Sequence, residues 1–235
     1  MPQHHLSLQP VGWLHTPYSE KFGTPRQPGL VPCTGYLVFA DDIDPTLATR
    51  ELNRFSHIWL IFWFHQAPSR RDQALVRPPR LGGNQKVGVF ASRSPFRPNP
   101  LGLTLVKHRG LAPTDRSQRP ALVVESPDLV DGTPILDIKP YLSYAEAIPD
   151  ALTGFAPSAP KARLDVQFTP QSEHAIKSLA RTHPDAHPVI REVIAQDPRP
   201  AYRQQDEGEY GVRLFGWNVR FSVRGHTATV TTITP

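Results

Sequence analysis

Proline places the strongest constraint on what this chain can fold into. Of its 235 residues 27 are proline, about twice the usual share of ~5%. The prolines are scattered through apolar segments and are not collected in one tail. Because proline breaks helix interiors and the central strands of sheets, the pattern excludes a long helical bundle. It predicts many short elements joined by fixed turns.

The rest of the composition is that of a folded protein. Apolar residues make up 39% of the chain and the formal net charge is +5, values that exclude a wholly disordered chain. Cys33 is the single cysteine, so neither an intramolecular disulfide nor a cysteine zinc cluster is expected. The longest apolar run, Ile58–Phe64, has seven residues, whereas a membrane span needs about twenty. We expect a soluble, cytoplasmic protein without a membrane segment.

Strand-like segments dominate the first two thirds of the sequence. They are short, rich in β-branched or aromatic residues, and bounded by Pro, Gly, Asp or Asn. The nearly continuous apolar run 55–64 predicts a strand buried on both faces, and Asp44 followed by Pro45 predicts a short helix over 45–52. Short strands without alternating helices favour a small closed β-barrel or sandwich over a doubly wound Rossmann sheet. The predicted strands are 6–14, 35–39, 57–64, 86–91, 102–109, 121–125, 135–138 and 163–168.

The pattern changes after Phe168. Amphipathic helices are predicted over 170–181 and 187–196, and Pro198 prevents the second from continuing. Strands are predicted over 210–215, 217–223 and 227–233, the last two joined by a hairpin. The chain is therefore expected to be mainly β, with a β-barrel domain at 1–146, a linker at 147–160 and a small α+β domain at 161–235.

Positive charge is concentrated in one stretch of the chain. Between Arg70 and Arg109 nine basic residues face the single acid Asp72, a local balance of +8, and 115–150 then carries a balance of −4. A basic block interleaved with prolines and aromatic residues is typical of a surface for an anionic partner. A solvated basic face without a partner explains the charge equally well.

Common catalytic and nucleotide-binding motifs are missing from the sequence. It contains no G-x-G-x-x-G, no P-loop, no G-x-S-x-G elbow and no H-E-x-x-H. The pair Gly82-Gly83 is most simply a hairpin turn. His57 and His65 flank an apolar run, but no acidic or cysteine partner stands at ligand spacing, so we expect histidines of the core or rim and no metal site.

Four clusters are more polar than their surroundings. The first, 16–29, fixes an arginine and a glutamine between prolines, which suits planar polar ligands. The second, 76–100, alternates arginines with prolines and phenylalanines, as in proteins that hold phosphates and stack bases. The third, 126–141, holds three aspartates able to bind a ribose diol or to act as a base. The fourth, 195–202, predicts a helix end and an Asp–Arg surface pair worth under ~1 kcal/mol. Taken singly, each also fits ordinary turn chemistry.

Five ordered segments carry a resemblance to a known family. They are PYxEKFGTPRQPGL, FSHIWLIFxFHQ, VRPPRLGGNxxVGVFASRSPFRPNPLG, LVDGTPILDIKPY and QDPRPAY. Over 11–221 the sequence resembles the TsaA-like β-barrel family, whose best-known bacterial members are tRNA methyltransferases of the TrmO type. The resemblance implies S-adenosylmethionine as methyl donor on a β-barrel, a homodimer, and a tRNA substrate carrying threonylcarbamoyladenosine at position 37, beside the anticodon.

The resemblance also implies roles for particular residues. The D-P-R-P-x-Y motif would place Asp197, Arg199 and Tyr202 beside the target nucleotide as catalytic residues. The methyl-donor site would be lined by Pro25, Arg26, Gln27, His65, Gln66, Arg93, Leu103, Asp128, Leu129, Val130 and Asp131. Phosphate contacts in the basic block would come from Arg70, Arg71, Arg77, Arg80 and Arg97.

The implied reaction requires the removal of a proton. An exocyclic nitrogen acylated as a urea is a poor nucleophile, so its methylation by a sulfonium needs a general base and an in-line approach at about 3 Å. The candidate bases are Asp197, Asp137, His65 and Tyr202, of which we favour Asp197.

Three alternative functions stay open on the sequence. One is a methyltransferase for another RNA or for a small metabolite. Another is a non-catalytic protein that binds S-adenosylmethionine or nucleic acid. A third is a scaffold without any ligand, which the polar loop clusters disfavour.

Overall fold

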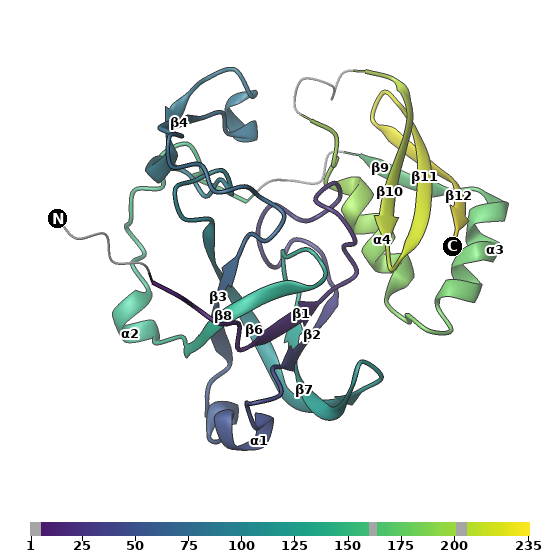
Figure 1. Cartoon of the computed structure of the whole chain (residues 1–235). Helices are drawn as coiled ribbons and strands as arrows, with labels where there is room; N and C mark the ends of the chain where they lie inside the picture. Colours follow the sequence, from purple (N-terminus) through teal and green to yellow (C-terminus); the bar gives the residue numbers. More distant parts are fainter. Residues whose placement is uncertain (1–5, 160–163, 201–205) are drawn as a thin grey trace.

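A six-stranded antiparallel sheet that closes on itself forms the first part of the molecule (Figure 1). The computed structural model describes residues 6–159, 164–200 and 206–235. The strand order around the closed sheet is β1-β2-β7-β6-β3-β8, and β8 pairs with β1 to complete the ring. The strands are β1 (Gly12–His15), β2 (Thr34–Phe39), β3 (His57–Trp63), β6 (Leu101–Thr114), β7 (Ser117–Glu125) and β8 (Thr133–Pro140).

The interior of the closed sheet is filled by apolar side chains at alternate strand positions. On β3, Ile58, Leu60 and Phe62 point into the core, whereas Trp63 is 45% exposed. The expectation that this strand is buried on both faces is therefore wrong, because only the inner face of an antiparallel ring is covered. The expected strand 6–14 is also too early, since β1 begins at Gly12.

A short helix lies at the lower end of the closed sheet in Figure 1. The Asp44 carboxylate accepts hydrogen bonds from the backbone N–H groups of Thr46 and Leu47, which confirms it as the N-cap of α1 (Pro45–Ala48). The helix ends earlier than expected, and a 3₁₀ turn, η1 (Leu52–Arg54), follows it.

The proline-rich segment between β3 and β6 forms a separate arm. The expected strand 86–91 is wrong: only two-residue strands pair there, β4 (Leu75–Val76) with β5 (Val87–Gly88). Prolines and glycines interrupt the ladder, and 3₁₀ turns take its place at η2 (Pro79–Leu81) and η3 (Val89–Ala91). Gly82 and Gly83 have φ of 70° and 73°, a left-handed conformation that favours glycine, and they form the expected turn between the two strands.

A small α+β unit follows the short helix α2 (Ser143–Glu146). Its sheet has the order β10-β11-β12-β9, with β9 parallel to β12. Both predicted helices are present, each beginning and ending within two residues of the expected positions, so the expected fold class is confirmed: mainly β, a closed sheet and then an α+β unit, and no Rossmann sheet. The elements are β9 (Asp165–Phe168), α3 (Pro170–Leu179), α4 (Ala186–Ala195), β10 (Gly208–Leu214), β11 (Trp217–Arg224) and β12 (Thr227–Thr234).

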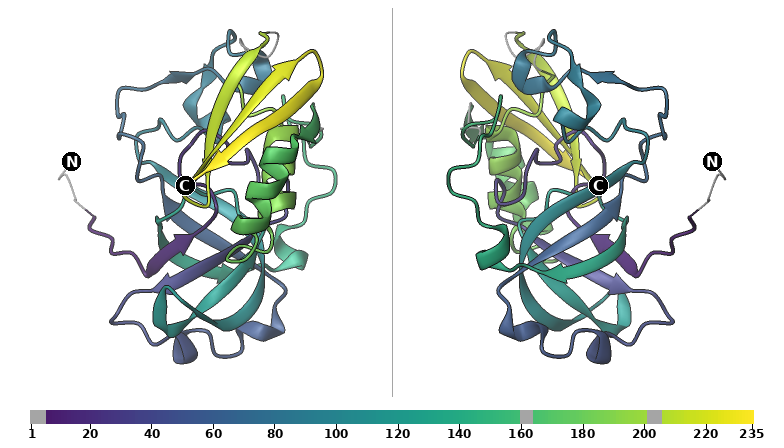
Figure 2. Two further views of the ribbon diagram at one scale, coloured as in Figure 1. Left: turned by 90° about the vertical axis from the view of Figure 1, so that its right-hand side faces the viewer. Right: turned by 90° about the vertical axis from the view of Figure 1, so that its left-hand side faces the viewer.

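The segment between β1 and β2 joins the two parts of the molecule (Figure 2). Tyr18 is fully buried among the side chains of α4 and β10 and forms a β-bridge with Leu214. At Gly23, an added Cβ would lie 2.3 Å from Cγ2 of Val212, so only glycine allows this close approach. The small unit is therefore anchored on the segment 16–33 by a shared apolar core. In the described residues no helix is long and apolar enough to cross a membrane.

Candidate functional site

Two of the polar clusters are locked together at one end of the closed sheet. The backbone N–H of Gly29 donates to the carbonyl of Ser126 at 2.9 Å, and that of Asp131 donates to the carbonyl of Tyr18 at 2.8 Å. The Thr16 hydroxyl donates to the carbonyl of Leu129 at 2.8 Å. The loop 16–29 and the turn 126–132 therefore form one rigid rim.

The second cluster reaches the first through two side-chain contacts. The Arg93 guanidinium donates to Oε1 of Gln27 at 3.0 Å, and Nζ of Lys21 lies 4.6 Å from the ring centre of Phe96. Arg93 also lies close enough to Asp128 for its charge to oppose the rise in pKa that burial causes in that carboxyl group. Three clusters that are far apart in the sequence thus meet at this end of the sheet.

Asp128 is a mostly buried carboxyl group held by a strand residue. Its Oδ1 accepts a hydrogen bond of 2.7 Å from the hydroxyl of Thr104, which is buried on β6. Burial raises the pKa of Asp128 above its ordinary value, although the bond from Thr104 and the charge of Arg93 act against this. Neighbouring Leu103 is 51% exposed. The sequence analysis missed Thr104; its signal was a polar residue at an inward position of the predicted strand 102–109.

Asp131 is held in the ionised form beside a second histidine that the sequence analysis missed. Nδ1 of His15 lies 3.2 Å from Oδ1 of Asp131, and the backbone N–H of Thr16 donates to the same oxygen at 3.0 Å. Burial raises the pKa of Asp131, but these hydrogen bonds outweigh burial and bring it below its ordinary value. Desolvation lowers the pKa of His65, against the charge of nearby Asp131. The pKa of Asp128 is thus raised and that of Asp131 is lowered within one site. Carboxyl groups whose pKa values are shifted in opposite directions typically have different chemical roles.

The fourth cluster contains a buried ion pair, and the expectation of a surface pair is wrong. Nε of Arg199 donates to Oδ1 of Asp197 at 2.7 Å and its Nη2 donates to Oδ2 at 3.0 Å, with side-chain exposures of 1% and 3%. The Arg199 guanidinium also donates to the carbonyl of Asp206 at 2.7 Å and lies over the ring of Tyr210. Asp197 has φ of 51°, which marks a sharp end to α4. The third member of the motif, Tyr202, lies outside the described residues.

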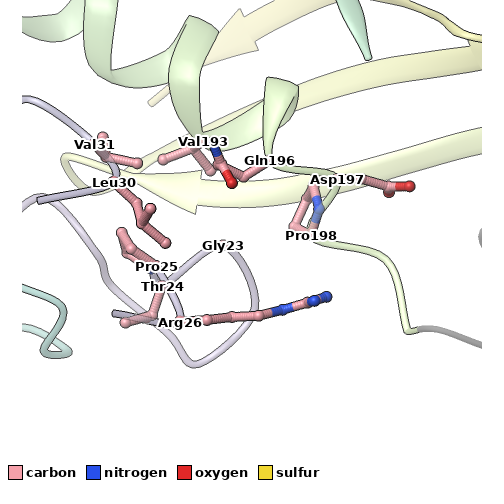
Figure 3. Close-up of a pocket in the computed structure, with 10 residues that line it drawn as sticks. All are labelled: Gly23, Thr24, Pro25, Arg26, Leu30, Val31, Val193, Gln196, Asp197 and Pro198. Atoms are coloured by element: carbon pink, nitrogen blue, oxygen red, sulfur yellow. The ribbon is translucent and has the colours of Figure 1, made fainter. Parts of the chain in front are cut away.

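A small cavity joins the first and fourth clusters (Figure 3). Its volume of about 30 Å³ is that of one water molecule, so it marks a contact between two motifs and is too small for a nucleotide. In Figure 3 the Asp197 carboxylate points away from Leu30 and Val31. The lining residues are Gly23, Thr24, Pro25, Arg26, Leu30, Val31, Val193, Gln196, Asp197 and Pro198.

Two of the expected residues, Leu129 and Asp137, do not offer their side chains to the rim. Leu129 packs into the core of the closed sheet with 3% exposure. Asp137 lies towards the opposite end, among the residues lining a separate cavity with Phe39 and Leu52, and pairs with Lys139 at 2.7 Å. Val130 is partly buried, and Gln66 is exposed beside His65.

The predicted phosphate contacts all lie on or beside the β4–β5 arm. Arg70, Arg71, Arg77 and Arg80 are exposed, whereas Arg97 is partly buried and donates to the carbonyl of Ser92 at 3.2 Å. Arg80 also donates to the carbonyl of Ser158. Within the described residues, no group of three or more His, Cys, Asp or Glu side chains is placed to hold a metal ion.

Two family models match the chain in succession. The model of the tRNA-methyltransferase O N-terminal domain matches residues 13–147, and the model of the TrmO C-terminal domain matches residues 161–235. Together the two matches include nearly all of the closed sheet, the rim and the whole small unit.

Similar proteins cover the chain almost from end to end. It is 46% identical over 221 residues to a "tRNA (adenine(37)-N6)-methyltransferase" of Escherichia coli, with 93% of each chain covered. It is 40% identical over 218 residues to a "Putative S-adenosylmethionine-dependent methyltransferase RcsF" of Pseudomonas aeruginosa, covering 92% of this chain and 91% of that one. The crystal structure of TrmO from Pseudomonas aeruginosa superimposes with a TM-score of 0.81 at 31% identity, covering all of both chains.

Proposed function

This chain belongs to the tRNA-methyltransferase O family, and from that premise we propose that it methylates the N6 nitrogen of threonylcarbamoyladenosine at position 37 of tRNA. The family makes it an S-adenosylmethionine-dependent tRNA methyltransferase. The observation that carries the proposal is the meeting of three polar clusters at one end of the closed sheet, with the fourth cluster packed against the first.

The rim has the chemical groups that a methyl-donor site needs. S-adenosylmethionine, when bound, supplies a methyl group on a positively charged sulfur, and it carries a carboxylate, an ammonium, a ribose diol and an adenine. Arg93, oriented by Gln27, suits the carboxylate. The ionised Asp131 suits the ribose hydroxyls or the ammonium, and exposed Leu103 offers an apolar surface to the adenine. The other expected donor residues on this rim are Pro25, Arg26, His65, Gln66, Asp128 and Val130.

His65 is the general base that the geometry favours. Both carboxylate oxygens of Asp197 already accept hydrogen bonds from Arg199 inside the protein, so both are engaged before any substrate binds. Asp137 lies away from the rim. His65 is exposed at the rim and its lowered pKa keeps the imidazole neutral near pH 7, so it is able to accept the proton of the urea nitrogen.

Asp197 and Arg199 then act by holding the end of α4 and the start of β10 together. Arg199 binds the Asp197 side chain on one side and the Asp206 carbonyl on the other. This pair keeps the motif against Pro25 and Arg26 of the loop 16–29, which we call the donor loop. The substrate tRNA would lie along the β4–β5 arm, with phosphates bound by Arg70, Arg71, Arg77, Arg80 and Arg97.

We also propose that the protein forms a homodimer. Trp13, Trp63 and Leu101 are 40%, 45% and 40% exposed. They point outward from β1, β3 and β6, and Trp63 lies opposite Leu101 in the strand register. Exposed tryptophans grouped with a leucine on one sheet face are typical of an interface between protein chains.

The test is a methylation assay with labelled S-adenosylmethionine. Native tRNA is compared with the same tRNA isolated without the threonylcarbamoyl group. Label entering only the modified tRNA supports the proposal. Equal label in both tRNAs would contradict the substrate assignment, and label in neither, with donor binding intact, would show that the substrate is a different molecule.

A further inference from the structure

The sheet of the small unit has one covered and one open face. Helices α3 and α4 pack on the first face, where Val212, Val219, Phe221 and Val230 are buried, and Figure 2 shows the helices on one side of the strands. The second face is polar. Three arginines lie on it, and they come from two of the four strands, β10 and β11. We call this surface the arginine face; it consists of Arg213, Asn218, Arg220, Ser222, Arg224 and Thr227.

The strand register places the arginines along one line of the sheet. Arg213 lies opposite Asn218, Arg220 lies opposite Gly211, and Arg224 lies opposite Thr227. Residues two apart on a strand share a face. The row from the level of Asn218 to Arg224 covers seven residues, and its six steps of about 3.3 Å span about 20 Å. Opposite Arg220, Gly211 has no side chain, and the amide oxygen of Asn218 lies 3.3 Å from where its Cβ would stand, so a polar group is the neighbour of Arg220 on this side.

The charges of this face are available to a ligand. Arg220 and Arg224 are exposed, and within the part of the chain that the structure describes neither forms an ion pair. Nε of Arg213 donates to the carbonyl of Gly216 at 3.1 Å. Glu209 is the exposed carboxylate within the row, opposite Ser222 and between the levels of Arg220 and Arg224. Glu207, which accepts a hydrogen bond from the backbone N–H of Gly225, and Asp165 on the far edge strand lie at the border of the face. Within β10 and β11 the outward side chains are three arginines and one glutamate, a net charge of +2.

We propose that the arginine face binds the sugar-phosphate backbone of the substrate tRNA. A polyanion complements a row of guanidinium groups, and the hydroxyl and amide side chains beside them are able to bind phosphate oxygens and ribose hydroxyls. No aromatic side chain stands among the described residues that point outward from this face, so it contacts the backbone and does not stack bases.

The position of the face relative to the rim supports the same partner. The backbone N–H of Arg213 donates to Oε1 of Glu20 on the donor loop at 3.1 Å, so the row begins next to the rim and runs away from it. Figures 1 and 2 show the small unit and the β4–β5 arm rising at the same end of the molecule. A single tRNA is therefore able to touch both basic surfaces while its target nucleotide lies at the rim between them.

The double variant Arg220→Ala/Arg224→Ala tests the proposal by tRNA binding across a series of salt concentrations. We expect the Kd for an unmodified tRNA transcript to rise about tenfold at low salt and the log–log salt slope to fall by about 1–2, because each lost phosphate contact removes about 0.9 from the slope. The affinity for S-adenosylmethionine and kcat at saturating tRNA should stay unchanged. The variant Arg220→Lys/Arg224→Lys should keep most of the slope.

The control is Arg54→Ala, an exposed arginine of the 3₁₀ turn η1 that follows α1, which should change neither Kd nor slope. A double alanine variant with the melting temperature, Kd and slope of the unchanged protein would overturn the proposal. The inference rests on tRNA being the substrate but not on which atom is methylated. Since the binding assay uses no methyl donor, failure of the arginine face and failure of the threonylcarbamoyl assignment are separate results.

Discussion

At the scale of single residues, the buried pair of Asp197 and Arg199 raises the question of whether these side chains stabilise the fold or take part directly in catalysis. Replacing Arg199 by alanine leaves a carboxylate buried without its counter-charge, which costs about 3–5 kcal/mol. We expect Arg199→Ala to lower the free energy of unfolding in urea and to lower kcat together. The double variant Asp197→Leu/Arg199→Met removes both charges and should recover most of the stability. An Asp197→Asn variant of unchanged stability and no turnover would instead assign Asp197 a direct part in catalysis.

His65 gives a second prediction at this scale, in the pH profile. A general base works only when unprotonated, so kcat/KM should fall as the pH falls through the pKa of His65. Because desolvation lowers that pKa, the fall should occur below the ordinary value of about 6.5. His65→Gln should reduce kcat by 10²-fold or more and abolish this acid limb, while His57→Gln, a histidine at the other end of β3, should keep it. A variant that retains the limb would contradict the assignment.

At the scale of elements, Arg119 on β7 holds the turn after β2. Its guanidinium donates to the carbonyls of Phe39, Ala40 and Ile43 at 2.8–3.2 Å and to the Asp41 carboxylate at 3.0 Å. Arg119→Ala leaves these carbonyls without their donor, a loss of about 1–3 kcal/mol. We expect a lower urea midpoint with unchanged kcat, since the turn lies at the end of the closed sheet away from the rim. A change in kcat at unchanged stability would contradict this structural role.

Some elements of this fold could be predicted from the sequence and others could not. Helices α3 and α4 and the cap of α1 follow from short-range signals, namely a proline at the first turn, a capping oxygen and an apolar stripe. The two-residue strands of the arm and the exposed outer face of β3 depend on which segments pair and cover one another, and residue order alone does not show this. For the same reason the motifs were visible in the sequence, but Thr104, His15 and the burial of the Asp197–Arg199 pair were not.

At the scale of the whole molecule, the two matched domains share one core through the segment 16–33. Tyr18, Val31 and Cys33 come from the N-terminal part and are buried among residues of the small unit. The same segment carries Arg26 and Gln27 of the proposed donor site, and its cavity contacts are with the end of α4. The donor loop is thus held between the closed sheet and the small unit, so the conformation of the donor site depends on both parts being folded.

The proposed homodimer is a prediction about the whole molecule that a single side chain tests. If the outer face of β1, β3 and β6 is the interface, placing a carboxylate in its middle requires burying an unpaired charge, which costs several kcal/mol. We therefore expect the wild-type chain to have the mass of a dimer in light scattering at micromolar concentration and Trp63→Glu to have that of a monomer. Leu47→Glu, at a more exposed apolar position on α1, should leave the dimer intact. A monomeric wild type, or a dimer that Trp63→Glu does not weaken, would show that this face does not join two copies, and the exposed tryptophans would then need a different partner.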